Sequence, residues 1–457
     1  YPCVVVFEKT DSPQDYEIDV VYGREKPDDE DVSEVLDEIR DLISEDIRHT
    51  TQHYATYKTQ FSDLNDREWR FTPKDANQLF RDLQSDSDYI LEEVADQISA
   101  GIKTGKNTVF ILSREEADHH GVEDEILKPI YRGSDVERFQ MSEPEEYLIY
   151  TDGIDLEDYP NALDYLREHK EALESRKDAT FRNKDKEWYE LNIPHSVEDM
   201  EAEKLICPEM SQRNNYALDK GGRYILNKVF FFHPNEIENL SSEFLLGLLN
   251  SSTLEFSLKQ TSSPLQNGYY QFLTRYQKRL PIKLDETLGE RVGALVEEIR
   301  SGIDLQNKVN SFPERYLRDS NDSLGYIDYE WQTRRYPVSA GIEEIDDGRF
   351  AVTAGRSDEI TDPLMDRGDR EERKLRAQYV HAAVDGRNMK KGEEQTIPIP
   401  RSQDGVEELI EALKTDRQTV EETSIEDLEA EIDQTVYDLF DLTDEEREVI
   451  EGYLEVF

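Results

Sequence analysis

Cysteine, positive charge and long apolar runs are all scarce in this chain of 457 residues. The only two cysteines, Cys3 and Cys207, are too few for a disulfide framework or a zinc site built from thiolates, so we expect a cytoplasmic protein. No apolar run approaches the roughly 18 residues that span a membrane, and residues 4–7 lack the basic flank of a signal peptide. A membrane partner is therefore not expected.

Basic residues are outnumbered, with 54 Lys and Arg against 104 Asp and Glu and a net charge of -50. One explanation is a disordered or DNA-mimicking acidic protein, and the other is a globular protein adapted to molar salt. The 24 tyrosines, the 17 phenylalanines and a clear apolar periodicity favour the globular protein. At about 1 M salt the Debye length is roughly 3 Å, so dense surface acid costs little stability. We expect a salt-adapted, haloarchaeon-like source.

Hydrophobic periodicity predicts a mixed α+β fold. The predicted strands lie at residues 2–8, 16–22, 108–112, 205–207 and 229–232, with a hairpin at 342–354. The predicted helices lie at 32–57, 73–102, 161–175, 244–251, 285–310 and through 406–457, where Thr443 and Glu446 form a capping box. The charge-dense segment 362–374 is expected to be a loop or linker.

The segment 204–284 differs in charge from the rest of the chain. It holds ten Lys and Arg against six Asp and Glu, a net of +4. A locally positive segment within so acidic a protein indicates an anionic partner.

Several short motifs occur in a fixed order from residue 101 onward. They are Gly101-Ile102-Lys103-Thr104-Gly105-Lys106-Asn107, Leu127-Lys128-Pro129-Ile130-Tyr131-Arg132-Gly133-Ser134-Asp135-Val136, Trp188-Tyr189-Glu190-Leu191, Leu245-Leu246-Gly247-Leu248-Leu249-Asn250-Ser251, Ser262-Ser263-Pro264 with Gly268-Tyr269-Tyr270, and Arg279-Leu280-Pro281. Together they resemble the target-recognition region of type IIG restriction-modification methylases, the TaqI-like C-terminal specificity domain. Residues 432–439, with Leu442 and Thr443, are similar to the tail of the same proteins.

The resemblance implies recognition of double-stranded DNA for an adenine-N6 methyltransferase that uses S-adenosylmethionine. It places the end of the methyltransferase domain and a helical linker at 1–100, the target-recognition domain at 101–284, and a helical region at 285–457 with a β insert at about 325–400. The Gly-rich donor motif and the Asn-Pro-Pro-Tyr motif do not occur in these residues. We therefore interpret the chain as part of a longer protein, and expect neither catalytic residues nor the methyl-donor site within it.

Arg213, Asn214 and Asn215 follow a predicted strand and are residue types that read base edges. Arginine pairs bidentately with guanine and asparagine with adenine. The alternative is a polar loop with at most a phosphate contact.

A second candidate segment combines amides, hydroxyls, tyrosines and cations, as suits a nucleic-acid groove. Its candidate DNA-binding residues are Gln260, Ser262, Ser263, Gln266, Tyr269, Tyr270, Arg275, Lys278 and Arg279. Alternatively, the two tyrosines are core residues beside a solvated loop. Arg132 and Arg138 either clamp phosphate or pair with the neighbouring Asp135 and Glu137.

Three further motifs fail as catalytic or metal sites. His119-His120 is expected to be surface, Glu372-Arg373-Lys374 matches half of a nuclease motif by chance, and Gly101 to Lys106 lacks the spacing of a phosphate-binding loop. Two other classes of protein stay open. One is a BREX-type phage-defence methylase with partner subunits of its defence system, and the other is a non-enzymatic acidic DNA mimic or inhibitor.

Overall fold

A computed structural model describes residues 17–457 apart from 25–31, 46–48, 61–70, 177–185, 263, 319, 333–336, 347 and 355–357. The chain divides into two compact units, one of residues 1–297 with 429–457 and one of residues 298–428. Helices alternate with several small sheets, so the predicted mixed α+β class is confirmed. The roles predicted for 1–100, 101–284 and 285–457 stay predictions.

The N-terminal part of the first unit is a three-stranded antiparallel sheet. Strand β1 (Glu17–Gly23) confirms the strand predicted at 16–22, and it pairs with β3 (Tyr54–Gln60), which also pairs with β2 (His49–Thr50). The helix predicted over 32–57 is wrong beyond α1 (Val32–Glu45). The aromatic and β-branched residues of β3 fit a buried strand better than a helix. The strand predicted at 2–8 lies outside the described residues.

The helix predicted over 73–102 is also wrong beyond its first half. Helix α2 (Lys74–Ser85) ends at Asp86, and β4 (Tyr89–Ile90), the single turn α3 (Leu91–Val94) and β5 (Ser99–Ala100) follow. Strand β4 pairs with β17 (Pro281–Ile282), so a distant segment decides its conformation. The strand predicted at 108–112 begins later, because α4 (Asn107–Phe110) precedes β6 (Ile111–Ser113).

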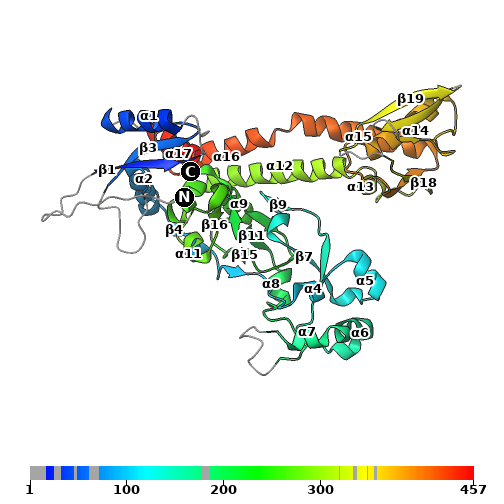
Figure 1. The fold of residues 1–457 in the computed structure, drawn as a ribbon, viewed down its shortest axis with the longest axis horizontal. Helices are drawn as coiled ribbons and strands as arrows, with labels where there is room; N and C mark the ends of the chain where they lie inside the picture. The colour runs from blue at the N-terminus through cyan, green and yellow to red at the C-terminus, as the bar shows by residue number, and fades with distance from the viewer. Residues whose placement is uncertain are drawn as a thin grey trace. The chain divides into compact units, whose positions relative to one another are not determined.

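Two four-stranded sheets form the centre of the first unit. The first has the order β14 (Tyr224–Ile225), β7 (Leu127–Tyr131), β10 (Glu146–Ile149), β6; the second has the order β13 (Ala217–Asp219), β11 (Lys204–Pro208), β15 (Val229–Phe232), β5. Strands β11 and β15, drawn side by side in Figure 1, confirm the predictions at 205–207 and 229–232. Ile130 and Leu148 of the first sheet share one apolar core with Ile206 and Phe231 of the second.

Shorter helices and strands complete this part of the first unit. They are α5 (Arg114–His120), β8 (Val136–Glu137), β9 (Gln140–Met141), α6 (Pro160–Glu168), α7 (Lys170–Glu174), α8 (Val197–Glu201), β12 (Met210–Ser211), β16 (Tyr270–Gln271) and α11 (Thr274–Gln277). The helix predicted at 161–175 is thus two helices, which meet at His169.

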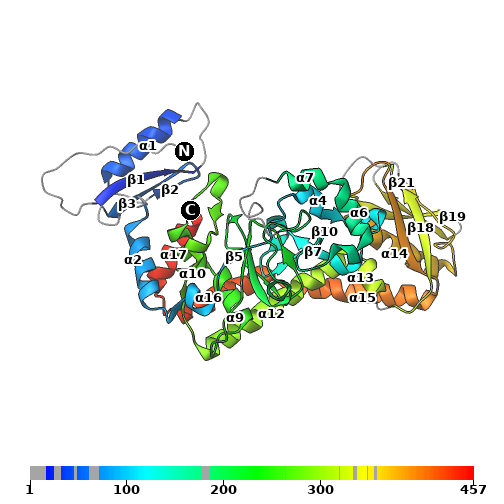
Figure 2. The same cartoon turned by 90° about the horizontal axis from the view of Figure 1, so that it is seen from below.

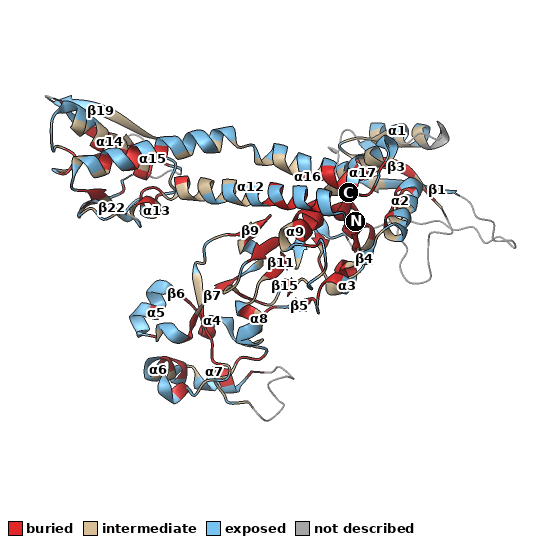
Figure 3. Ribbon diagram, turned by 180° about the vertical axis from the view of Figure 1, so that it is seen from behind, coloured by how far each residue is buried: buried red, intermediate tan, exposed pale blue. Residues whose placement is uncertain are grey.

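Helix α9 (Ser242–Asn250) contacts β13 of the second sheet, and further helices pack beside α9. In α9 every residue from Phe244 to Asn250 is buried, which Figure 3 shows in red, and this helix confirms the prediction at 244–251. Helix α10 (Ser252–Thr261) contacts α2 and α17 (Asp444–Val456), as Figure 2 shows. Helix α17 begins with the predicted capping box, because Thr443 accepts from the Glu446 amide and Glu446 accepts from the Thr443 amide. Helix α16 (Ile425–Leu439) precedes it.

The second unit is a β-rich module with helices. Its elements are α13 (Glu314–Leu317), the ribbon of β18 (Leu324–Glu330) and β22 (Glu394–Pro400), the sheet of β19 (Ala340–Asp346), β20 (Arg349–Ala354) and β21 (Asp358–Ile360), α14 (Arg370–Val384) and α15 (Gln403–Glu422). The hairpin predicted at 342–354 is confirmed, as is the helix at 285–310, which is α12 (Glu286–Asn310). The loop predicted at 362–374 is wrong from residue 370 onward, because Asp369 caps α14 there.

Gly101 makes a close backbone approach in the centre of the first unit. Its amide donates to the Val229 carbonyl at 2.8 Å, and a Cβ at this position would lie 2.4 Å from the carbonyl oxygen of Ile225. We expect Gly101→Ala to lower the free energy of unfolding by about 2–3 kcal/mol, because backbone atoms must move. Chemical denaturation measures this change.

Gly133→Ala is the matched control. A Cβ there would meet nothing closer than 3.5 Å, so the change should stay within about 1 kcal/mol. An equal effect of both variants would contradict the close approach at Gly101.

Candidate nucleic-acid interface

Two irregular segments distant in sequence lie side by side in the first unit. We call residues 209–215 and 262–271 the paired loops. Strand β12 pairs antiparallel with β16, with Met210 opposite Gln271 and Ser211 opposite Tyr270. The Gln212 side chain donates to the Asn267 carbonyl at 3.0 Å. The structure thus joins the two segments that the sequence singles out.

The outer side of the paired loops is exposed over a continuous stretch. Residues 264–269 are all exposed, as are Met210, Gln212 and Arg213. The chain reverses at Asn267 and Gly268, whose φ angles of 60° and 72° lie in the left-handed region. The exposed stretch therefore presents amides, one guanidinium and an aromatic ring, Tyr269, which is 41% exposed.

Buried polar side chains hold the inner side of the paired loops. The Ser262 hydroxyl donates to the Gln271 carbonyl at 2.7 Å and accepts from the Gln271 amide at 3.0 Å, which closes the second loop at its base. The fully buried Gln277 amide accepts from the Tyr216 hydroxyl at 3.1 Å and donates to the Phe272 carbonyl. These bonds replace the regular ladder that an irregular loop lacks.

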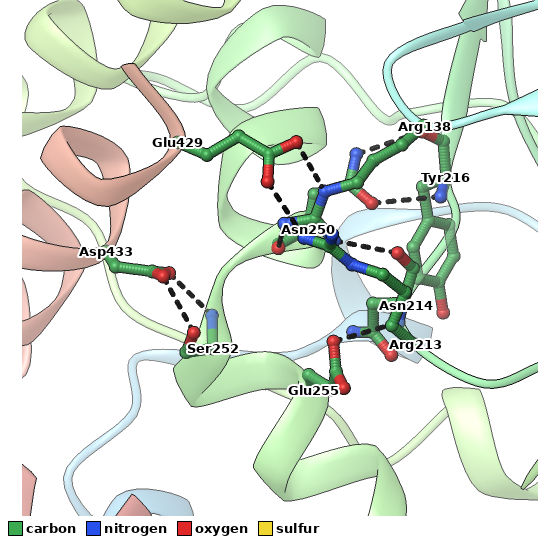
Figure 4. Close-up of polar contacts among 9 residues, drawn as sticks. All are labelled: Arg138, Arg213, Asn214, Tyr216, Asn250, Ser252, Glu255, Glu429 and Asp433. Carbon is green, nitrogen blue, oxygen red and sulfur yellow. Dashed lines mark hydrogen bonds and ion pairs between the residues drawn. The ribbon is translucent and has the colours of Figure 1, made fainter. Parts of the chain in front are cut away.

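A second buried cluster lies under the first loop (Figure 4). Arg138 donates through Nη1 to the Asn214 carbonyl at 2.8 Å and through Nη2 to the Asn250 carbonyl. The Asn250 side chain accepts from the Tyr216 amide and donates to the Tyr216 carbonyl, both at 2.9 Å. Glu429 of α16 accepts from Arg138 at 3.0 Å and from Arg213 at 2.8 Å.

The predicted DNA-binding residues fall into two groups. The exposed group is Arg132, Arg213, Gln266, Tyr269, Arg275 and Arg279, with Lys278 partly exposed. The group turned inward is Arg138, Asn214, Asn215, Gln260, Ser262 and Tyr270, while Ser263 lies outside the described residues. For the residues of both groups, a role in DNA binding stays a prediction.

The inward asparagines bond to the protein. The Asn214 amide group donates to the Leu249 carbonyl at 2.6 Å, and that of Asn215 donates to the Val136 carbonyl at 2.9 Å. Both side chains therefore help to hold the loop, whereas Arg213 points its guanidinium to the surface with 55% exposure.

Most exposed cations already have protein partners. Arg132 binds Glu146 with two bonds, at 2.5 and 2.9 Å. Lys278 binds Glu92 at 2.6 Å, and the Arg275 guanidinium donates to the Tyr276 hydroxyl and lies over its ring.

The locally positive surface expected for 204–284 needs correction. Among the described residues, seven of its ten cations lie within 4 Å of a carboxylate: Lys204, Arg213, Lys220, Arg223, Lys259, Lys278 and Lys283. Several of these carboxylates, such as Glu92 and Glu429, come from outside the segment. Counting charge along the sequence missed them, so the charge of this surface is less positive than predicted.

Sequence reasoning also missed functional candidates around the paired loops. Gln212 and Asn267 are exposed amides on the same stretch, and Met210 is 45% exposed. Their position next to Arg213 and Gln266 was the available signal. No signal in the sequence pointed to Glu429, because its partners lie more than 200 residues earlier.

Residues 128–282 match the TaqI-like C-terminal specificity domain family. This stretch is thus similar to the specificity domains of that family. The resemblance predicted from the short motifs is confirmed, and the paired loops lie within the matched residues.

The chain is similar to curated type II methyltransferases. It is 21% identical over 256 residues to the type II methyltransferase M.BstVI of Geobacillus stearothermophilus, covering 54% of this chain and 44% of the relative. It is 24% identical over 228 residues to M.BanIII of Aneurinibacillus aneurinilyticus, covering 47% and 39%. The chain thus spans less than half the length of these relatives.

Two solved structures also match parts of the chain. The Type IIL restriction-modification enzyme MmeI in complex with DNA has a TM-score of 0.37 and 14% identity, with 46% of this chain and 28% of that chain covered. The type IIG restriction endonuclease BpuSI has a TM-score of 0.34 and 14% identity, with 62% and 35% covered.

Two other classes of site are absent from the described part of the chain. It holds no group of three or more His, Cys, Asp or Glu side chains arranged to bind a metal ion. Nor does any helix of those residues have the length and apolar character to cross a membrane.

Cys207 lies on β11 directly before the first of the paired loops. Burial raises the pKa of its thiol well above its usual range, and its Sγ contacts the Gln277 side chain at 3.5 Å. Because the thiolate is the reactive form, we expect Cys207 to resist iodoacetamide at pH 8 in the native protein. Mass spectrometry of a Cys3→Ser variant measures the modification.

The same variant unfolded in urea is the control, and there Cys207 should react fully. Equal rates of modification in the native and unfolded protein would show that β11 opens readily beneath the paired loops.

Proposed function

We propose that this chain recognises a specific sequence in double-stranded DNA for a type II restriction-modification adenine methyltransferase. The observation that carries the proposal is the exposed side of the paired loops within a TaqI-like specificity domain. To read the edges of DNA bases, a protein needs exposed polar side chains that are held in place by a hydrogen-bonded backbone beneath them.

The exposed side chains have the chemistry for this task. The Arg213 guanidinium has the fork that pairs with guanine, and the amides of Gln212, Gln266 and Asn267 match adenine. Tyr269 offers a ring that stacks on a base or wedges between base pairs. Arg275 and Arg279 supply cations for phosphates.

Adaptation to high salt is consistent with recognition through base edges more than through phosphates. With 104 acidic and 54 basic residues the chain suits molar salt, where counterion release contributes little affinity. Phosphate contacts then stabilise the complex less than usual, so contacts to base edges and DNA shape must contribute more. The pairing of most cations of 204–284 with carboxylates is consistent with this.

Methyl transfer is assigned to no residue of this sequence. S-adenosylmethionine is the donor that a methyltransferase of this kind uses, and it would bind to a catalytic domain outside these residues. That domain and the specificity domain would then hold the DNA between them while an adenine is flipped out of the duplex.

A protein that mimics DNA would need carboxylates on its exposed surface in place of the phosphates of DNA. The exposed stretch 264–269 contains none, since it reads Pro-Leu-Gln-Asn-Gly-Tyr. This favours DNA binding over DNA mimicry. The BREX-type alternative shares the same recognition role and differs in partner subunits.

Arg213→Ala is expected to weaken binding to the specific duplex by about 5- to 150-fold even at high KCl, because one bidentate base contact is worth roughly 1–3 kcal/mol. Arg275→Ala should also weaken binding, and its effect should depend more on salt if it contacts phosphate. Fluorescence anisotropy with the full-length protein measures both.

Lys414→Ala is the control, since this exposed lysine of the second unit forms an ion pair with Glu411, three residues earlier. Wild-type affinity in both arginine variants would contradict the placement of the interface.

Long-read sequencing of the host genome tests the proposed function itself. Deletion of the gene should remove adenine methylation at one short motif, which also reveals the recognised sequence. A methylome unchanged by deletion of an expressed gene would contradict the proposal.

A further inference from the structure

One carboxylate in the buried cluster is shared by two arginines. Glu429 of α16 accepts from Nε of Arg138 through Oε1 at 3.0 Å and from Nη2 of Arg213 through Oε2 at 2.8 Å, as Figure 4 shows. The side chains of Arg138 and Glu429 are 15% and 19% exposed, against 55% for Arg213. The pair of bonds therefore runs from the interior to the surface.

The inner half of this arrangement is rigid. Arg138 bonds to the carbonyls of Asn214 and Asn250, which fixes its guanidinium. The Asn214 amide donates to Glu255 at 3.1 Å, and the amide of Tyr216 donates to the Asn250 side chain. The backbone after Arg213 is thus bonded at Asn214 and again at Tyr216, and Arg138 orients the Glu429 carboxylate from the inside.

Helix α16 is itself held at this place. Asp433, one turn after Glu429, accepts from the amide and the hydroxyl of Ser252 at 2.6 and 2.7 Å. Ser252 begins α10, and Asp433 therefore ties α16 to the helix that leads into the second of the paired loops. Helix α16 therefore contacts the first loop directly and the helix that precedes the second loop.

We propose that Glu429 is a positioning residue for specificity, which holds the Arg213 guanidinium ready for a base edge; this rests on the proposed function. Its bond uses Nη2 of Arg213, and the other guanidinium nitrogens have no acceptor among the described residues. A guanidinium fixed along one edge and open along another loses less conformational entropy when it pairs with guanine. A segment more than 200 residues away in sequence would thus set how well the loop discriminates.

The test is a double-mutant cycle in the full-length protein. Glu429→Gln, Arg213→Ala and the double variant are compared with wild type by the ratio of Kd for a mismatched duplex to Kd for the duplex carrying the methylated motif. Glu429→Gln should lower this ratio about 3- to 10-fold, a part of the discrimination that one arginine contact gives. In the Arg213→Ala background it should change the ratio less than about 2-fold.

Glu431→Gln is the matched control. Glu431 also lies on α16 and binds a surface arginine, Arg291, at 2.8 Å, so this variant removes the same charge from the same helix. Its ratio should equal that of wild type. Glu429→Asp should also lower the ratio, because its side chain is shorter. A melting temperature equal to that of wild type would show that this variant is folded.

Three results would overturn the inference. They are an unchanged ratio in Glu429→Gln and Glu429→Asp, an equal fall with and without Arg213, or tighter binding to both duplexes alike, which would indicate charge repulsion alone. Each of these results is informative only if the wild-type protein binds the duplex with the methylated motif more tightly than the mismatched duplex. A wild-type protein that binds both duplexes equally would instead refute the proposed function and the inference with it.

Discussion

An irregular loop stays rigid only when the polar groups on its inner side are hydrogen bonded. The paired loops meet this constraint with side chains, because they form only short ladders of their own. Arg138 donates to the Asn214 carbonyl of the first loop, Asn250 bonds to both backbone groups of Tyr216 directly after that loop, and Ser262 bonds to both backbone groups of Gln271 in the second. The outer side chains are thereby left available for a ligand.

The acidic composition shapes the same region. Carboxylates reach the cations of 204–284 from α3, α16 and the residues after α2, as Glu92, Glu429 and Asp86 do. A surface whose cations are already paired attracts nucleic acid less through charge alone. Discrimination would then rest on shape and hydrogen bonds, which molar salt screens least.

Long apolar runs with one period were predictable from the sequence. Helices α9, α12 and α17 and strands β11 and β15 lie where periodicity places them. The predictions failed where a helical spacing continued into short strands, as at Tyr54–Gln60, because pairing with β1 decides the conformation there. Pairing between distant segments leaves no trace in local spacing.

The candidate site was predictable as two segments but not as a surface. Arg213 and Tyr269 are exposed, while Asn214, Ser262 and Tyr270, of similar composition, are buried. What separates them is contact with residues far along the chain, such as Leu249, Gln271 and Glu429. Sequence composition cannot report which side of a loop faces such partners.

The central claim is that the exposed side of the paired loops contacts DNA. Hydrogen–deuterium exchange of the full-length protein, with and without a duplex carrying the methylated motif, tests it most directly. The account predicts that residues 209–215 and 262–271 gain protection at high salt only with the specific duplex. Protection elsewhere in the protein, with these loops unchanged, would contradict it.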